Sequence, residues 1–301
     1  MSKVSEVSDQ FTPVITGDGS STFYSAEFHE WFHSRAGACC EAQTTYVVAA
    51  HLVQRAQQMP AGSVLKILDV CYGLGYNTAA ALEMIWAVNH NCQVEVKALE
   101  IDLAAARSAI AQNLTQSYSF PIQQILQDLS IHCTAKTKNL QAQILLGDAR
   151  QQIQPLVAQN WQADVIFLDP FSPPNCPQLW TTEFLCLVAR CLKPNGGELV
   201  TYSCAAAVRA SLLLADLTIG TLSTPARQWP GTIASYSPLT DLAALSQQAQ
   251  EHLQTRAAVP YRDPHLNATA EEILAHRIQA QAVSKLMPTK PWRRRWAASR
   301  R

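Results

Sequence analysis

Short apolar runs alternate with longer mixed segments through the middle of the chain. The runs predict strands at residues 64–70, 94–102, 142–148, 163–169 and 196–203. A segment of helical character follows each run, at residues 78–88, 104–114, 149–160, 179–192 and 206–216. Strands that alternate with helices indicate βαβ units in a mostly parallel sheet, and uniformly apolar runs are typical of strands covered on both faces. We therefore expect a doubly wound, Rossmann-like α/β fold, with residues 217–222 and 232–237 completing the sheet.

The two ends of the chain have a different pattern. The first 45 residues show no clean periodicity, whereas residues 46–58 are expected to be helical. Residues 115–140 form a long polar connection with a short helix, and residues 241–287 are helical with a break at PYRDP. The pattern predicts an N-terminal extension, an α/β domain and a helical C-terminal extension with a basic tail, at residues 1–45, 46–240 and 241–301.

Composition narrows the class of protein. The 301 residues are 48% hydrophobic and 15% charged, which excludes wholesale disorder. No apolar run approaches the roughly 18 residues of a membrane span, and the N-terminus has no apolar segment typical of a secretory signal. Nine cysteines without a C-x-x-C pair are expected to be reduced thiols. We expect a cytoplasmic protein that does not partner a membrane.

Charge is unevenly placed along the chain. From residue 251 onward there are ten Lys/Arg and four Asp/Glu, a net charge of +6, whereas the first 250 residues carry 13 basic and 19 acidic side chains. No acid follows Glu272. A basic tail on a mildly acidic body can attract phosphates. A solubilising, disordered end explains the same composition.

Acidic residues stand where the predicted strands end. Ligands of an open parallel sheet bind beyond the carboxyl ends of its strands. A carboxylate at Glu100 can accept hydrogen bonds from both hydroxyls of a ribose, whereas Asp102 is placed to cap the next helix. Asp148 can accept from an adenine amino group or cap a helix. The set at the strand ends is Asp69, Glu100, Asp102, Asp148 and Asp169.

The turn after the first of these strands is YGLGYN. Gly73 and Gly75 would let the backbone approach a ligand at the N-terminus of the following helix. The dinucleotide fingerprint requires a third glycine where this chain has Thr78, which disfavours a nicotinamide cofactor. A plain strand-to-helix turn would also explain both glycines.

The loop that follows the fourth strand is rich in proline and begins Asp169-Pro170-Phe171. Prolines lower the cost of ordering a loop. Asp169 can accept hydrogen bonds from an amine and orient its lone pair, while Phe171 packs on a flat ring. The alternative is an aspartate that only caps a turn.

Residues 29–33, HEWFH, match the H-E-x-x-H motif of zinc proteases. A zinc site needs a third protein ligand, and the positions where one class of these proteases has Gly and His hold Ala36 and Cys39. We therefore expect no metal here, and place His29 and His33 at the surface or on the substrate side.

Together these motifs resemble a family. The chain resembles a class I S-adenosylmethionine-dependent methyltransferase, and more closely the methyltransferase module of the tRNA 5-methylaminomethyl-2-thiouridine biosynthesis protein, MnmC type. The resemblance runs from about Thr16 to about Ser235 and lies in TGDGSSTFYS, EFHEWFHSRAGA, DVCYGLGYNT, LEID, GDAR, FLDPFSPPNCPQLWT and TYSCAAAVR. It departs at Cys71, where the family usually has glycine, and no oxidase domain fits, so the resemblance is to a stand-alone form.

The resemblance implies S-adenosylmethionine as cofactor and 5-aminomethyl-(2-thio)uridine at the tRNA wobble position as methyl acceptor, supplied by separate enzymes. Asp169 would be catalytic. By resemblance the cofactor would contact Asp69, Gly73, Gly75, Tyr76, Asn77, Glu100, Ile101, Asp148 and Ala149. The substrate would contact Tyr24, Glu41, Pro170, Phe171 and Ser172.

Two alternatives remain open at this point. Aminopropyltransferases share the acids at the strand ends and bind small amines with further acids in the pocket. This chain has Pro-Phe-Ser-Pro-Pro at residues 170–174 and a basic tail, which favours RNA. The other alternative is a methyltransferase-like scaffold that binds RNA without turnover.

Overall fold

The central element is an eight-stranded sheet. The computed structural model describes residues 11–60, 62–224, 229–237 and 243–298. Its sheet has the order β11-β12-β10-β9-β5-β6-β8-β7. The parallel strands are β5 (Val64–Val70), β6 (Gln93–Glu100), β8 (Leu140–Leu146), β9 (Val165–Leu168) and β10 (Glu198–Thr201). The antiparallel strands are β7 (Thr134–Lys136) at one edge, β11 (Thr218–Leu222) at the other edge, and β12 (Gly231–Ser235) between β11 and β10.

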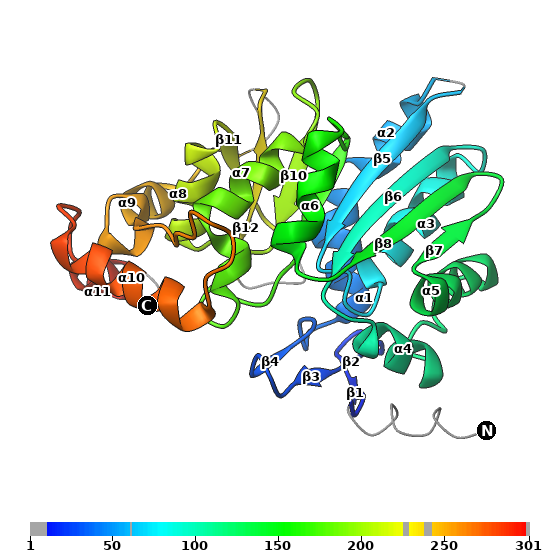
Figure 1. The fold of residues 1–301 in the computed structure, drawn as a ribbon, viewed down its shortest axis with the longest axis horizontal. Coiled ribbons are helices and arrows are strands. Elements are labelled where there is room, and N and C mark those ends of the chain that lie inside the picture. Colours follow the sequence, from blue (N-terminus) through cyan, green and yellow to red (C-terminus); the bar gives the residue numbers. More distant parts are fainter. Residues whose placement is uncertain (1–10, 61, 225–228, 238–242, 299–301) are drawn as a thin grey trace.

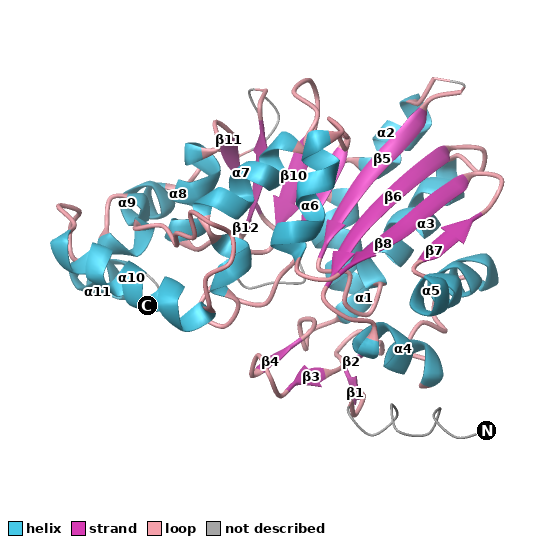
Figure 2. Cartoon of the chain, in the orientation of Figure 1, coloured by secondary structure: helices cyan, strands magenta, loops and turns pink. Residues whose placement is uncertain are grey.

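Helices cover both faces of this sheet, as Figures 1 and 2 show. Leu65 and Ile67 of β5 pack on one face, with α3 (Tyr76–Val88), α4 (Ala104–Ala111) and α5 (Phe120–His132). Leu68 and Val70 pack on the other face, with α6 (Ala149–Ala158), α7 (Thr182–Arg190) and α8 (Ala206–Leu214). The doubly wound α/β prediction is therefore confirmed. The strand order reverses between β5 and β9, where ligands of such sheets bind.

The sequence-based expectation was least accurate around residues 115–140. This segment contains the 13-residue helix α5 and the edge strand β7, followed by β8 from Leu140. Its few apolar residues are spaced for burial of one helix face, through Ile122, Ile125 and Leu129. The polar composition of this segment predicts only a short helix, because the face of α5 opposite these residues is exposed to solvent and polar.

Two small hairpins precede the sheet. They are formed by β1 (Val14–Ile15) with β2 (Ser21–Thr22), and by β3 (Tyr24–Ser25) with β4 (Glu30–Trp31). Figure 1 shows both at one end of the sheet. Asp18 fixes the first turn, because its carboxylate accepts hydrogen bonds from the amides of Ser20 and Cys40 at 3.0 and 2.8 Å.

The helix expected at residues 46–58 is interrupted. Helix α1 (Ala38–Glu41) continues into a π-helix η1 (Ala42–Val48), which ends inside this segment, and α2 (Leu52–Gln58) forms the rest of it. His51 has a left-handed φ of 54°, which separates the last two. The domain boundary expected at residue 45 falls inside η1, and the one expected at residue 240 lies outside the described residues.

The C-terminal extension is helical and packs beside α8. It contains α9 (Gln247–Leu253), η3 (Arg256–Ala258), α10 (Ala270–Val283) and α11 (Thr289–Ala298). The break expected at residues 260–264 lies between η3 and α10, where buried Tyr261 joins the main core. All nine cysteines are free thiols. None of the helices within the described ranges is long and apolar enough to cross a membrane.

Candidate active site

A cavity of about 650 Å³ opens at the carboxyl ends of β5, β6 and β9, between the sheet and the β3–β4 hairpin. Its size is ordinary for a small-molecule site. Eleven of the residues expected in the site line it: Glu41, Gly73, Asn77, Glu100, Ile101, Asp148, Ala149, Asp169, Pro170, Phe171 and Ser172. Four expected residues lie outside the lining: Tyr24, Asp69, Gly75 and Tyr76.

Glu100 forms one wall of the cavity at the end of β6. Its Oε2 accepts a hydrogen bond from the amide of Gly73 at 2.7 Å, and its Oε1 accepts from the amide of Ile101 at 2.8 Å. Burial raises the pKa of Glu100 to about 7, against these opposing hydrogen bonds. Each oxygen retains a lone pair for a further donor such as a ribose hydroxyl. Asp102 instead caps α4, accepting from the amide of Ala104 at 2.7 Å.

Asp148 both lines the cavity and caps α6. Its Oδ1 accepts from the amide of Arg150 at 2.9 Å, and the Arg150 guanidinium contacts Oδ2 at 2.7 Å. Burial alone would raise the pKa of Asp148, but the bonds and charge of Arg150 hold it below its usual value. Asp148 therefore stays ionised, as a hydrogen-bond acceptor should.

Asp69 and Gly75 do not line the cavity but have packing and hydrogen-bond contacts close to it in the chain. Asp69 is fully buried, and its Oδ2 accepts from Thr78 Oγ1 at 2.7 Å. A Cβ on Gly75, where φ is 85°, would lie 2.6 Å from Tyr72 Oη. Packing against Tyr72 thus favours glycine at position 75, and the close approach of a ligand to Gly75 stays a prediction. Gly73, with φ of 55°, lines the cavity itself.

The two expected tyrosines have other contacts. Buried Tyr76 donates to the carbonyl oxygens of Ser21 and Leu114, at 2.8 and 2.9 Å, and so joins α3 to the N-terminal hairpin. Tyr24 is exposed and packs edge-on against Trp31, with ring centroids 5.1 Å apart.

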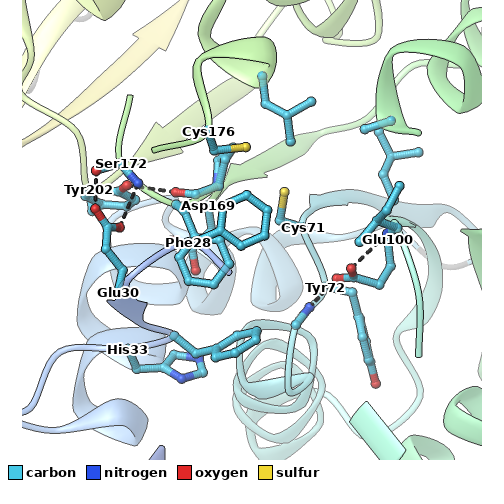
Figure 3. A pocket seen from close by; sticks show the side chains of 18 of the residues that line it. Phe28, Glu30, His33, Cys71, Tyr72, Glu100, Asp169, Ser172, Cys176 and Tyr202 are labelled. Carbon is cyan, nitrogen blue, oxygen red and sulfur yellow. Dashed lines mark hydrogen bonds between the residues drawn. The ribbon is translucent and has the colours of Figure 1, made fainter. Parts of the chain in front are cut away.

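Asp169 is held from two sides at the end of β9. Its Oδ1 accepts a hydrogen bond from Tyr46 Oη, and its Oδ2 accepts from Asn77 Nδ2 at 2.8 Å. Tyr46 comes from the π-helix η1, a type of helix frequently found at functional sites. The two donors fix the plane of the carboxylate at the cavity wall. In the view of Figure 3, Asp169 and Glu100 lie on opposite sides of Cys71.

Contacts from distant segments fix the loop after Asp169. Glu30 accepts from the amide of Ser172 at 2.8 Å, from its hydroxyl, and from Asn175 Nδ2 at 2.8 Å. Trp180 Nε1 donates to the carbonyl oxygen of Phe171 at 2.8 Å, and Tyr202 Oη donates to that of Pro170 at 2.7 Å. These contacts within the chain hold the loop in place.

Aromatic rings line the side of the cavity next to Asp169. The rings of Phe28 and Phe171 stack at 4.5 Å with 15° between their planes, and Phe32 meets Phe171 edge-on at 5.0 Å. Sequence reasoning named Phe171 but missed Phe28, Phe32, Tyr46 and the role of Glu30. The aromatic density of FYSAEFHEWF was the available signal.

The HEWFH segment does not have the geometry of the zinc motif. That motif needs both histidines on one helix face, whereas Glu30 and Trp31 form strand β4 and exposed His29 has a φ of 53°. His33 is buried, with its Nδ1 3.3 Å from Thr22 Oγ1. Within the part of the chain that the structure describes, no group of three His, Cys, Asp or Glu is arranged to hold a metal ion.

The residues that line the cavity fit S-adenosylmethionine. Glu100 offers a carboxylate for vicinal hydroxyls, Asp148 an acceptor for an amino group, and Gly73 a backbone that a ligand can approach closely. Asp148 and Asp169, both acidic, also line the cavity, which suits a cationic sulfonium.

Comparisons with known proteins agree with this fit. Residues 106–237 match a family described as S-adenosyl-L-methionine-dependent methyltransferase. The chain is 25% identical over 284 residues to an uncharacterized protein of Methanocaldococcus jannaschii, covering 91% of this chain and 73% of that protein. It is 29% identical over 206 residues to the tRNA 5-methylaminomethyl-2-thiouridine biosynthesis bifunctional protein MnmC of Acidovorax sp. strain JS42, covering 64% of this chain and 30% of that protein.

The crystal structure of MNMC2 from Aquifex aeolicus matches over more of the chain than the Acidovorax protein does. Its TM-score is 0.78 at 30% sequence identity, over 90% of this chain and 85% of that one. By contrast, the chain spans about a third of the length of the bifunctional relatives that it matches.

Proposed function

Because this chain belongs to the MnmC-type family of S-adenosylmethionine-dependent methyltransferases, we propose that it methylates the aminomethyl nitrogen of 5-aminomethyl-(2-thio)uridine at the wobble position of tRNA. The observation that carries this proposal is Asp169, a carboxylate oriented by Tyr46 and Asn77, beside stacked aromatic rings and in the same cavity as Glu100.

The bound cofactor supplies an electrophilic methyl group on a sulfonium. The chain has to hold the acceptor amine in line and neutral, because positioning supplies much of the acceleration of such a transfer. Asp169 accepts a hydrogen bond from the amine N–H, which directs the nitrogen lone pair into the cavity. As the new N–C bond formed, the S–CH3 bond of the sulfonium would break and its electron pair would stay on sulfur, which leaves as a neutral thioether. Asp169 would accept the proton released by the amine, directly or through a water.

The wobble base must leave its stack to reach Asp169. The aromatic group of Phe28, Phe32 and Phe171 offers it faces and edges to replace that stacking. Glu30 keeps Phe171 in place through its hydrogen bonds to Ser172. A substrate with a flat ring next to its amine therefore suits this side of the cavity.

A small polyamine is a weaker fit. Polyamine sites need acids that are available to cationic amines, but two acids of this lining have internal partners. Glu30 binds the Ser172 loop, and Glu41 Oε2 accepts from the amide of Ser34 at 2.6 Å. Assay of putrescine with decarboxylated S-adenosylmethionine separates the two activities, and product formation there would favour the aminopropyltransferase alternative.

The test in cells is mass spectrometry of wobble nucleosides with and without the gene. We expect 5-aminomethyl-(2-thio)uridine to accumulate without the protein and the methylaminomethyl form to return on complementation. If the wobble nucleosides are unchanged, 5-aminomethyl-(2-thio)uridine is not the substrate. A protein that binds tRNA but never forms product would support the scaffold alternative.

A further inference from the structure

Helix α11 carries the strongest local charge in the described part of the chain. Lys290, Arg293, Arg294 and Arg295 lie within its ten residues, which include no acid. In Figure 1 α11 lies next to α9 and α10, at the end of the molecule opposite β7. The sequence left open whether this tail is disordered or contacts phosphates. Its last two arginines, Arg300 and Arg301, lie outside the described residues.

Two tryptophans attach α11 to α9. The ring of Trp292 stacks on His252 at 3.8 Å with 5° between the planes, and its Nε1 donates to the carbonyl oxygen of Gln248 at 3.0 Å. Trp296 Nε1 donates to Glu251 Oε2 at 2.9 Å. Both rings are therefore engaged with α9. Their contacts hold the helix in place.

The segment before α11 is also anchored. The amide of Arg256 donates to the carbonyl oxygen of Met287 at 2.8 Å, and the amide of Met287 donates to that of Gln254 at 3.1 Å. Thr289 Oγ1 accepts from the amide of Ala257 at 3.1 Å. Since α11 is fixed at its start and along its length, its outer side chains are presented from a defined surface.

The outer face of α11 is basic. At 100° per residue, Lys290 and Arg294 lie one turn apart on the side opposite Trp292 and Trp296. Both are exposed, as is Arg293 beside them. Arg295 pairs with Glu251 at 3.2 Å, whereas no carboxylate in the described ranges forms an ion pair with the other three. Like charges one turn apart repel each other, so an external anion would stabilise this face.

We propose that the outer face of α11, formed by Lys290, Arg293 and Arg294, docks the phosphate backbone of the RNA substrate. The inference rests on the proposed function for the identity of that RNA. The face lies outside the catalytic cavity, whose lining contains no residue of α9, α10 or α11. The contact is independent of sequence, because phosphates carry no base information.

The test uses the full chain with Lys290→Gln and Arg294→Gln combined, and unmodified tRNA as the probe. The matched control is Lys136→Gln with Lys138→Gln, which removes two exposed charges at the β7 edge of the sheet. Affinity is measured by filter binding at several salt concentrations. Affinity for S-adenosylhomocysteine and thermal unfolding are followed in all three proteins.

Each phosphate contact contributes about 0.9 to the slope of log affinity against log salt for duplex nucleic acid. We therefore expect the α11 variant to lower the slope by about 1.8, so that its affinity loss is roughly tenfold larger at 50 mM than at 200 mM salt. The control should keep the wild-type slope, and cofactor affinity should be unchanged. An unaltered slope in the α11 variant, or an equal change in the control, would overturn the docking surface.

Failure of the proposed function has a different signature. If the wild-type chain binds no tRNA, both the proposed substrate and the proposed docking surface are contradicted. If it binds and methylates tRNA but the α11 variant is indistinguishable from wild type, only the docking surface falls. Methylation adds a further readout, since the KM for whole tRNA should rise in the variant while kcat is kept.

Discussion

The phenol of Tyr46 donates a hydrogen bond to Oδ1 of Asp169, joining residues that lie 123 positions apart in the chain. Tyr46 is fully buried in the π-helix η1, and Asp169 directly follows strand β9 at the cavity wall. Together with Asn77, Tyr46 leaves the carboxylate one orientation. We infer that Tyr46 positions the proton acceptor without touching the substrate.

Tyr46→Phe should therefore slow methyl transfer by about tenfold, because misplacing a catalytic group by a small distance is costly. Affinity for S-adenosylmethionine should not change, since Tyr46 does not line the cavity. Single-turnover rates and calorimetry measure the two effects. Tyr236→Phe removes a half-buried phenol outside the cavity and serves as the control. Equal rates for wild type and Tyr46→Phe would show that Tyr46 does not position Asp169.

The second prediction concerns Glu100 and pH. Glu100→Gln should weaken S-adenosylmethionine binding about 10- to 100-fold, because a hydrogen bond to a charged group contributes ~1.5–3 kcal/mol. Burial raises the pKa of Glu100 to about 7 in the cofactor-free protein. Hydroxyl donors bind the ionised form, so affinity should fall as the pH is lowered through about 7.

Calorimetry between pH 5.5 and 8.5 tests both parts, with Asp102→Asn as the control at a neighbouring carboxylate (the pH limits are about one and a half units on either side of the raised pKa). Glu100→Gln should lose the pH dependence. Asp102→Asn should keep it with a lower midpoint, because the charge of Asp102 contributes to the raised pKa of Glu100. Persistence of the dependence in Glu100→Gln would assign it to another group.

The sequence predicts the acidic residues of this site but not their partners. Glu100, Asp148 and Asp169 were found because the carboxyl ends of parallel strands meet at one edge of a sheet. Each of them lines the cavity. Tyr46 and Glu30 were not found as partners of the Asp169 loop, because their contacts span more than 120 residues and leave no local pattern.

Packing also decided what composition left open. The G-x-G turn predicts ligand approach at Gly75, and the structure adds a packing reason for this glycine, because an added Cβ would meet Tyr72 and Leu126. Helix α5 was underestimated, since only one of its faces is apolar. For residues 289–298, composition is also compatible with a disordered tail. The structure has helix α11 there, and the contacts of Trp292 and Trp296 with α9 hold it in place.

The third prediction follows from Gly75. Gly75→Ala should lower the free energy of unfolding by about 1–3 kcal/mol beyond the cost of its left-handed φ, because its Cβ would lie 2.6 Å from Tyr72 Oη. Gly196→Ala is the matched control, with a φ of 73° and no atom within 4 Å of an added Cβ. Denaturant unfolding compares them. Equal losses would mean that Tyr72 moves aside easily.

A fourth prediction concerns the support of Asp148 by the C-terminal extension. Asp263, which is 1% exposed, accepts from Arg150 Nη1 at 2.7 Å, and Arg150 in turn holds Asp148. Removing one partner of a buried pair costs about 3–5 kcal/mol. Asp263→Ala should therefore destabilise the fold by this amount.

The same change should reduce discrimination at the adenine amino group, because Arg150, which contacts Asp148, would lose one of its anchors and keep the carbonyl oxygen of Ala268. Calorimetry with S-adenosylhomocysteine and its 6-oxo analogue measures that discrimination. An Asp263→Ala protein that retains wild-type stability and discrimination would show that Arg150 holds Asp148 without help.

The most direct measurement of the central claim is single-turnover methyl transfer to tRNA that carries 5-aminomethyl-uridine at the wobble position, with products resolved by nucleoside mass spectrometry. We predict that the wild-type chain forms the methylaminomethyl nucleoside. Asp169→Ala should do so at least about 100-fold more slowly, the usual contribution of a positioned proton acceptor, while its affinity for S-adenosylmethionine is retained. No product with the wild-type chain, or a loss of less than about tenfold in Asp169→Ala, would contradict the account.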